Sequence, residues 1–169
     1  MFQYFQGIPL HPLVVHFAVV LVVLLVVGAA VYALVPPLRR RIGWAVALLA
    51  IAGPVAAWVG TESGEELQKL VQAQGYPQEF IDLIVEHSRY GDRTQWFAIG
   101  LSVASLLLIF VSTAVGNRPA AEGETRKGSL AATVGLAIVV LVLAGFTGYY
   151  VYKTGDTGAH MRWVDFAKK

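Results

Sequence analysis

Four long apolar stretches dominate the chain, at residues 13–35, 42–59, 96–115 and 130–152. Each is close to the ~20 apolar residues that carry an α-helix across ~30 Å of hydrocarbon. None of the four contains Asp, Glu, Lys or Arg. The pattern predicts an all-α fold, in which four transmembrane helices form a bundle within a single domain over residues 1–169.

The polar segment between the second and third stretches, residues 60–93, also has a helical pattern. Ser63 is followed three residues later by Glu66, which is typical of a capping box at a helix start. Apolar residues then recur at three- and four-residue spacing on one face, and His87 shares that face. We therefore expect short amphipathic surface helices in this outer loop, with a bend at Gly91 before the third span.

Composition and charge agree with four spans. Hydrophobic residues make up 56% of the chain and charged residues 14%, against ~25% charged in soluble domains. Lys and Arg in short loops mark the cytoplasmic side of a membrane protein. The two loops expected inside carry Arg39, Arg40 and Arg41, and Arg118, Arg126 and Lys127. Both termini are therefore predicted to lie outside.

The residues that could carry chemistry fall on the predicted outer side. Every Asp and Glu except Glu122 and Glu124 is there, as are all the histidines: His11, His16, His87 and His160. The chain has no cysteine, which excludes thiolate ligands and covalent attachment of haem. We find no nucleotide-binding loop and no basic nucleic-acid patch, so no nucleic-acid partner is expected.

Two histidines on separate helices suggest a haem. His16 lies about one turn inside the first span, and an ionisable side chain in lipid is expected to face the bundle interior and to find a partner there. Paired histidines of a helical bundle commonly hold b-type haem. We therefore predict a membrane-embedded b-type cytochrome or electron-transfer subunit, a redox carrier rather than a stand-alone enzyme. Haem b would lie near the outer face, with His16 and His87 as axial ligands and His11 as the substitute candidate.

Two alternatives remain open. Glu62, Glu65 and Glu66, together with His87, could hold iron, manganese or zinc in a carboxylate and histidine site. The chain could instead be a non-catalytic accessory or assembly subunit whose histidines serve structure. The expected partners are the lipid bilayer, subunits of a respiratory or other membrane complex, and a second copy of the chain in a homodimer.

Several motifs point to a known family. They are IPLHPLVVHF at residues 8–17, GTESGEE at 60–66, Glu86-His87 with Gly91, and TGDTGA at 154–159. With these motifs the chain resembles the domain of unknown function 2231 family over nearly its whole length. The resemblance implies a four-span protein of the bacterial cytoplasmic membrane, sometimes joined to cytochrome c modules, with no established activity.

Overall fold

A computed structural model describes residues 4–5, 8–116 and 123–167 of the chain. Helices account for almost all of the described residues, so the predicted all-α fold is confirmed. Two short strands, paired antiparallel with Tyr4 opposite Pro9, precede the first helix. The elements are β1 (Tyr4–Phe5), β2 (Ile8–Pro9), α1 (Leu10–Leu34), the 3₁₀ turn η1 (Pro36–Leu38), α2 (Arg39–Ala73), α3 (Gln78–Gly116) and α4 (Gly123–Ala167).

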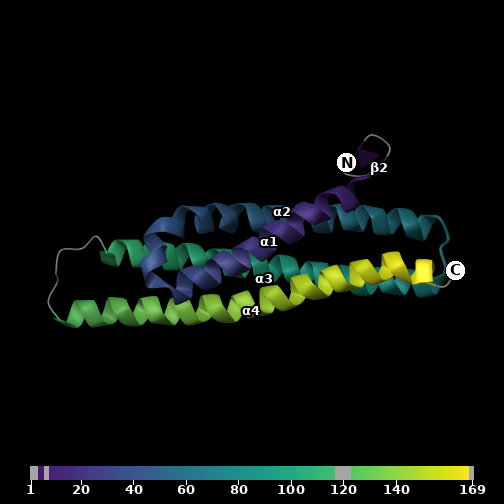
Figure 1. The fold of residues 1–169 in the computed structure, drawn as a ribbon. Coiled ribbons are helices and arrows are strands. Elements are labelled where there is room, and N and C mark those ends of the chain that lie inside the picture. The colour runs from purple at the N-terminus through teal and green to yellow at the C-terminus, as the bar shows by residue number, and fades with distance from the viewer. Residues whose placement is uncertain (1–3, 6–7, 117–122, 168–169) are drawn as a thin grey trace.

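The helices form two hairpins that lie side by side (Figure 1). The first hairpin is α1 and α2, joined by η1, and the second is α3 and α4. Each helix packs mainly on its two neighbours in the ring α1, α2, α3 and α4, so α1 and α3 face each other across the bundle. Both hairpins reverse direction at one end, which we call the turn end. The start of α1, the α2–α3 connection and the finish of α4 lie at the other, which we call the terminal end.

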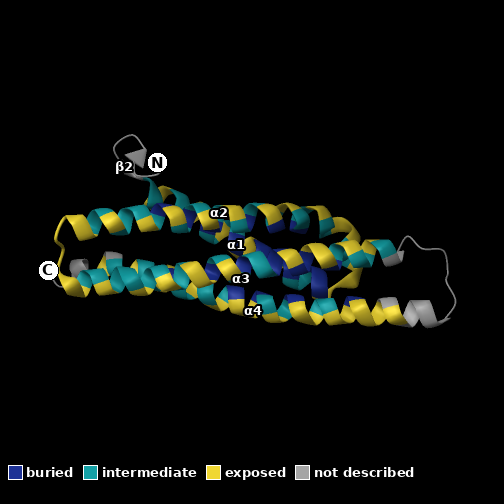
Figure 2. Cartoon of the chain, turned by 180° about the vertical axis from the view of Figure 1, so that it is seen from behind, coloured by how far each residue is buried: buried dark blue, intermediate teal, exposed yellow. Residues whose placement is uncertain are grey.

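The interior is lined by small and aliphatic side chains, while large apolar side chains cover the outside. Leu25, Leu101 and Leu108 are fully buried, whereas Phe17 and Trp44 are more than 70% exposed. Figure 2 shows the buried residues along the contact lines between helices and the exposed ones on the outward faces. A surface of this kind suits lipid rather than water. All four helices are long and apolar enough to cross a membrane, so the chain is a multi-pass membrane protein with four candidate spans.

The prediction of separate surface helices between the second and third spans is wrong. α2 runs without a break from its apolar span to Ala73, and α3 begins at Gln78. The two are separated by a short turn in which Gly75 has a φ of +70°, a left-handed conformation that glycine adopts at little cost. The helical pattern in residues 60–93 was therefore real, but its helices are extensions of the two spans.

Ser63 and Gly91, at which the sequence predicted a helix start and a bend, both lie inside continuous helices. Ser63 is buried inside α2 and donates its hydroxyl to the Gly60 carbonyl at 2.9 Å, so it does not cap a helix. Gly91 remains helical within α3. A helix of 35 residues is ~52 Å long, which exceeds the ~30 Å hydrocarbon core. The end of α2 and the start of α3 extend past the apolar spans and pack against each other there, so they do not form separate helices on the membrane surface.

Arg39 fixes the turn end of the first hairpin. Its Nε donates to the Tyr32 carbonyl at 2.9 Å and its Nη2 to the Ala33 carbonyl at 3.1 Å. These are carbonyls of the last turn of α1, which have no partner within the helix. The Tyr32 hydroxyl lies 2.8 Å from Ser112 Oγ and links α1 to α3. The turn end is thereby held by polar contacts next to the basic residues expected on the cytoplasmic side.

Candidate histidine site at the terminal end

His11 and His87 meet at the terminal end of the bundle. Their ring centroids are 6.2 Å apart and the ring planes are inclined at 82°. His11 belongs to the first turn of α1 and His87 to the part of α3 that precedes its apolar span. Because α1 and α3 face each other across the bundle, the two imidazoles approach from opposite sides. Both are half-buried.

The first imidazole is oriented by α2. His11 Nδ1 lies 3.1 Å from the Gly60 carbonyl oxygen and 3.1 Å from Ser63 Oγ. The carbonyl can only accept, and the serine hydroxyl already donates to that same carbonyl. Nδ1 must therefore carry the hydrogen in both contacts. In the neutral ring this leaves Nε2 with a lone pair, which is the form of histidine that binds a metal ion.

The second imidazole is oriented in the same way by α4. His87 Nδ1 lies 3.0 Å from Thr157 Oγ1. The Thr157 hydroxyl can donate to the Lys153 carbonyl at 2.8 Å, which leaves its oxygen able to accept from His87 Nδ1, and the Thr154 backbone is a further hydrogen-bond partner of this ring. His87 is thus held in the tautomer found for His11, and its Nε2 also has a lone pair when the ring is neutral.

Each imidazole also lies directly against a glycine. A Cβ atom at Gly64 would be 3.1 Å from His11 Cε1, and one at Gly158 would be 3.1 Å from His87 Cε1. Such contacts are tighter than side chains normally make, so only glycine lets the rings approach these helix backbones without displacement. The site consists of two imidazoles. Each packs against a glycine and is hydrogen-bonded to the Ser or Thr that comes directly before that glycine in the sequence.

The structure places His16 elsewhere. Its side chain is exposed on α1, and its Nδ1 lies 2.7 Å from the Pro12 carbonyl one turn earlier. The expectation that His16 faces the bundle interior is wrong, because the core positions of α1, such as Leu25 and Ala29, turn inward and leave His16 on the outer surface, where its ring bonds to the Pro12 carbonyl. His160 is also exposed, on α4. The partner of His87 across the bundle is His11, which the sequence suggested only as a substitute.

The carboxylates of the alternative metal site remain on the surface of α2. Glu62 and Glu65 are exposed, and Glu66 is half-buried with its Oε1 3.4 Å from Lys69 Nζ. Among the described residues, no three His, Asp or Glu side chains gather in a group that could hold a metal ion. In this part of the chain the imidazole pair is therefore not a member of such a group.

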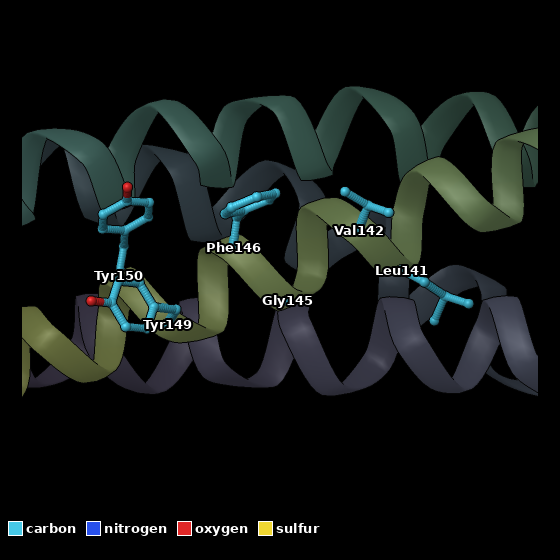
Figure 3. Close-up of a pocket in the computed structure, with 6 residues that line it drawn as sticks. All are labelled: Leu141, Val142, Gly145, Phe146, Tyr149 and Tyr150. Atoms are coloured by element: carbon cyan, nitrogen blue, oxygen red, sulfur yellow. The ribbon is translucent and has the colours of Figure 1, made fainter.

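Figure 3 shows a surface groove on α4 that no histidine lines. Phe146 and Tyr150 form part of its wall, and each stacks on Phe97 of α3, with centroid distances of 5.3 and 5.0 Å. These stacked rings join α3 to α4. The groove contains no acid, base or histidine and opens on the apolar face, so it suits a lipid chain better than a reaction. It is lined by Leu141, Val142, Gly145, Phe146, Tyr149 and Tyr150.

Reasoning from sequence missed the residues that orient the imidazoles. The sequence pattern predicts a helix cap at Ser63 and places Thr157 within the TGDTGA motif, and it pairs neither residue with a histidine. A signal was nevertheless present, since a hydroxyl residue followed by glycine occurs soon after the second span and again soon after the fourth. Two such hydroxyl–glycine pairs and two histidines, all on the same predicted side of the membrane, suggest that each pair contacts one histidine.

The whole chain was compared with known protein families, curated proteins and solved structures. No curated protein and no solved structure matches it. One family does match, under the description "Predicted membrane protein (DUF2231)", over residues 7–167. This range contains all four helices and both imidazoles, so the chain belongs to the DUF2231 family of predicted membrane proteins.

Proposed function

We propose that this protein is a membrane-embedded electron carrier that binds a b-type haem between His11 and His87. The observation that carries the proposal is the pairing of two imidazoles across the bundle with both Nδ1 atoms already hydrogen-bonded. An axial histidine needs a fixed ring and a lone pair on the nitrogen that faces the iron. His16 also has an Nδ1 contact, to the Pro12 carbonyl, but it is exposed and only His11 lies across the bundle from His87, which favours His11 over this predicted ligand.

The separation of the rings supports one shared metal ion. A metal–imidazole bond is about 2.0–2.1 Å long and an imidazole nitrogen lies roughly 1 Å from its ring centre, so two axial imidazoles have centroids roughly 6 Å apart. The centroids of His11 and His87 are 6.2 Å apart. The observed centroid distance therefore matches that of two imidazoles that hold one iron from opposite sides.

The number of protein ligands favours haem over a bare ion. Structural zinc takes four protein ligands, and catalytic zinc or non-haem iron takes three. A haem iron needs only two, because the porphyrin supplies the other four. Among the described residues the imidazoles are not part of any larger group of metal-binding side chains. A carboxylate and histidine site for iron, manganese or zinc therefore has less support.

The proposed haem would lie on the outer face of a bacterial cytoplasmic membrane. The positive residues near the turn end favour a cytoplasmic position for that end, and the histidines are at the opposite end. A haem there could exchange electrons with an outer redox protein or with subunits of a respiratory complex. Exposed apolar surface leaves room for such subunits, or for a second copy, within the bilayer.

An optical spectrum of the detergent-purified protein, oxidised and then reduced with dithionite, tests the proposal. We expect a Soret band and sharp α and β bands on reduction, with iron and haem in equal amounts. His11→Ala and His87→Ala should each lose the spectrum, while His16→Ala, on the same helix as His11 but exposed, should keep it. A colourless protein, even after haem is supplied during expression, overturns the proposal and favours an accessory subunit.

A further inference from the structure

The contacts of the two imidazoles are related by constant shifts along the chain. His87 follows His11 by 76 residues, whereas Thr157 follows Ser63 by 94 and Gly158 follows Gly64 by the same 94. In each case the imidazole Nδ1 meets a hydroxyl and the ring edge meets the next residue, a glycine. The helix pair α1 and α2 thus makes one half of the site, and the pair α3 and α4 makes the other.

The shift found for the histidines also aligns the cores of α1 and α3. Starting from Leu25, which is 0% exposed, a shift of 76 residues leads to Leu101, which is also 0% exposed. A shift wrong by one or two residues would turn core positions toward lipid. Five core positions of α1 fall on buried positions of α3: Ala18 on Thr94, Val22 on Ala98, Leu25 on Leu101, Ala29 on Ser105 and Tyr32 on Leu108.

The other shift aligns α2 with α4 in the same way. Val46 is 1% exposed, and Val140, 94 residues later, is 0% exposed. The agreement continues along both helices to the residues next to the site. The further buried pairs are Ala50 with Ala144, Gly53 with Thr147, Ala57 with Val151, and Gly60 with Thr154. The hydroxyl contact, the glycine contact and the core positions therefore follow one constant shift over about five turns of helix.

The directions of the helices complete the relationship. Both hairpins start at the terminal end, reverse at the turn end and return, as Figure 1 shows. Repeats with this parallel arrangement are related by a two-fold axis along the membrane normal. The difference between the shifts, 94 minus 76, means that the second hairpin has 18 more residues between its equivalent positions. If these additional residues lie near the turn of the second hairpin, the packed helix segments of the two hairpins still superimpose.

We infer that the two hairpins are structural repeats and that the ligand lies on the pseudo-two-fold axis between them, held on opposite sides by equivalent imidazoles. The inference rests on the proposed haem and narrows its class to a six-coordinate iron that His11 and His87 would hold together. A centre of this class has no open position for oxygen or a substrate. When bound, such a group would supply one-electron transfer, with the electron donor and the electron acceptor provided by other redox proteins.

The test compares the two halves in the full-length protein. His11→Gly and His87→Gly each open a cavity that free imidazole can enter. We expect both to lose haem occupancy by at least tenfold, to equal extents, and to recover the six-coordinate low-spin spectrum at similar imidazole concentrations. His16→Gly is the matched control and should behave as the unchanged protein. A variant of either histidine that keeps its haem, or carbon monoxide binding to the unchanged reduced protein, overturns the shared site.

A second comparison does not depend on haem. Ser63→Ala and Thr157→Ala remove equivalent hydroxyls, so the haem-free protein should lose thermal stability by similar amounts in both. The exchange Ser63→Thr with Thr157→Ser should be tolerated, because each half accepts either hydroxyl. If the unchanged protein is colourless but these variants match, the haem proposal fails while the repeats stand. If only one of the two alanine variants lowers the melting temperature, the equivalence of the halves is refuted.

Discussion

The Ser63 hydroxyl of α2 lies 3.1 Å from His11 Nδ1 of α1 and donates its own hydrogen to the Gly60 carbonyl. The serine oxygen and the Gly60 carbonyl therefore both accept from His11 Nδ1 and hold the ring, although the serine stands 52 residues away in the chain. A residue with this position acts on a ligand through the imidazole rather than by touching the ligand itself. Its removal tests the site without removing an axial histidine.

Ser63→Ala should weaken haem binding by about 10- to 100-fold, the usual effect of losing a group that orients a metal-binding histidine. Titration of the haem-free protein with hemin, followed by the Soret band, measures the change. Ser88→Ala is a suitable control, because Ser88 is the neighbour of His87 but its hydroxyl bonds to the Val85 carbonyl of its own helix. Equal affinities for Ser63→Ala and the unchanged protein would remove Ser63 from the site.

Gly158→Ala should separate stability from ligand binding. Replacing a helical glycine with alanine favours the helix by about 0.5–1 kcal/mol. The added methyl would lie 3.1 Å from His87 Cε1, so the ring must move and haem affinity should fall. Gly155→Ala, on the same helix with nothing within 4 Å, should gain the helix preference and keep the affinity. Hemin titration and thermal unfolding of both variants distinguish the effects.

Leu25→Ala should be among the most destabilising changes in the bundle. Leu25 is 0% exposed in the core shared by the four helices, and truncating a buried leucine costs about 2–5 kcal/mol. Leu24→Ala provides the comparison, because Leu24 is 48% exposed on the lipid-facing side of the same helix. Unfolding in mixed detergent micelles with rising SDS measures both. Similar losses from the two variants would contradict the assignment of the core.

Tyr32→Phe removes the hydroxyl that lies 2.8 Å from Ser112 Oγ. Hydrogen bonds between transmembrane helices contribute about 0.6 kcal/mol on average and about 1.7 kcal/mol at most. We expect a loss in this range, measured by the same SDS unfolding. Tyr152→Phe, at an exposed position of α4, should have no comparable effect. A loss above the range would mean that the Tyr32 hydroxyl has a larger role at the turn end.

The orientation in the membrane can be tested by labelling, because the chain contains no cysteine. Tyr76→Cys, in the exposed turn between α2 and α3, should react with an impermeant maleimide in intact cells. Arg40→Cys, near the turn end, should react only after the membrane is permeabilised. The basic loops favour this result. Labelling of Arg40→Cys alone in intact cells would reverse the predicted topology.

Prediction from sequence succeeded where the signal is local. Each apolar span could be identified from its own residues, since the bilayer demands a length and a lack of charge that no other part of the chain satisfies. The helical pattern in residues 60–93 was also correct. Its division into surface helices was wrong, because the capping signal at Ser63 depends on what surrounds the serine, and in the bundle that surrounding is the His11 imidazole.

The sequence by itself determined four apolar helices long enough to cross a membrane, and it predicted that the histidines share one side. Only the tertiary structure decided that His11 rather than His16 meets His87. The rotation of α1 about its axis is set by core packing along its whole length, with Leu25 and Ala29 turned inward, and this turns His16 outward. Contacts between residues more than 50 positions apart, such as His11 with Ser63, arise from packing between helices and leave no periodic trace in either helix alone.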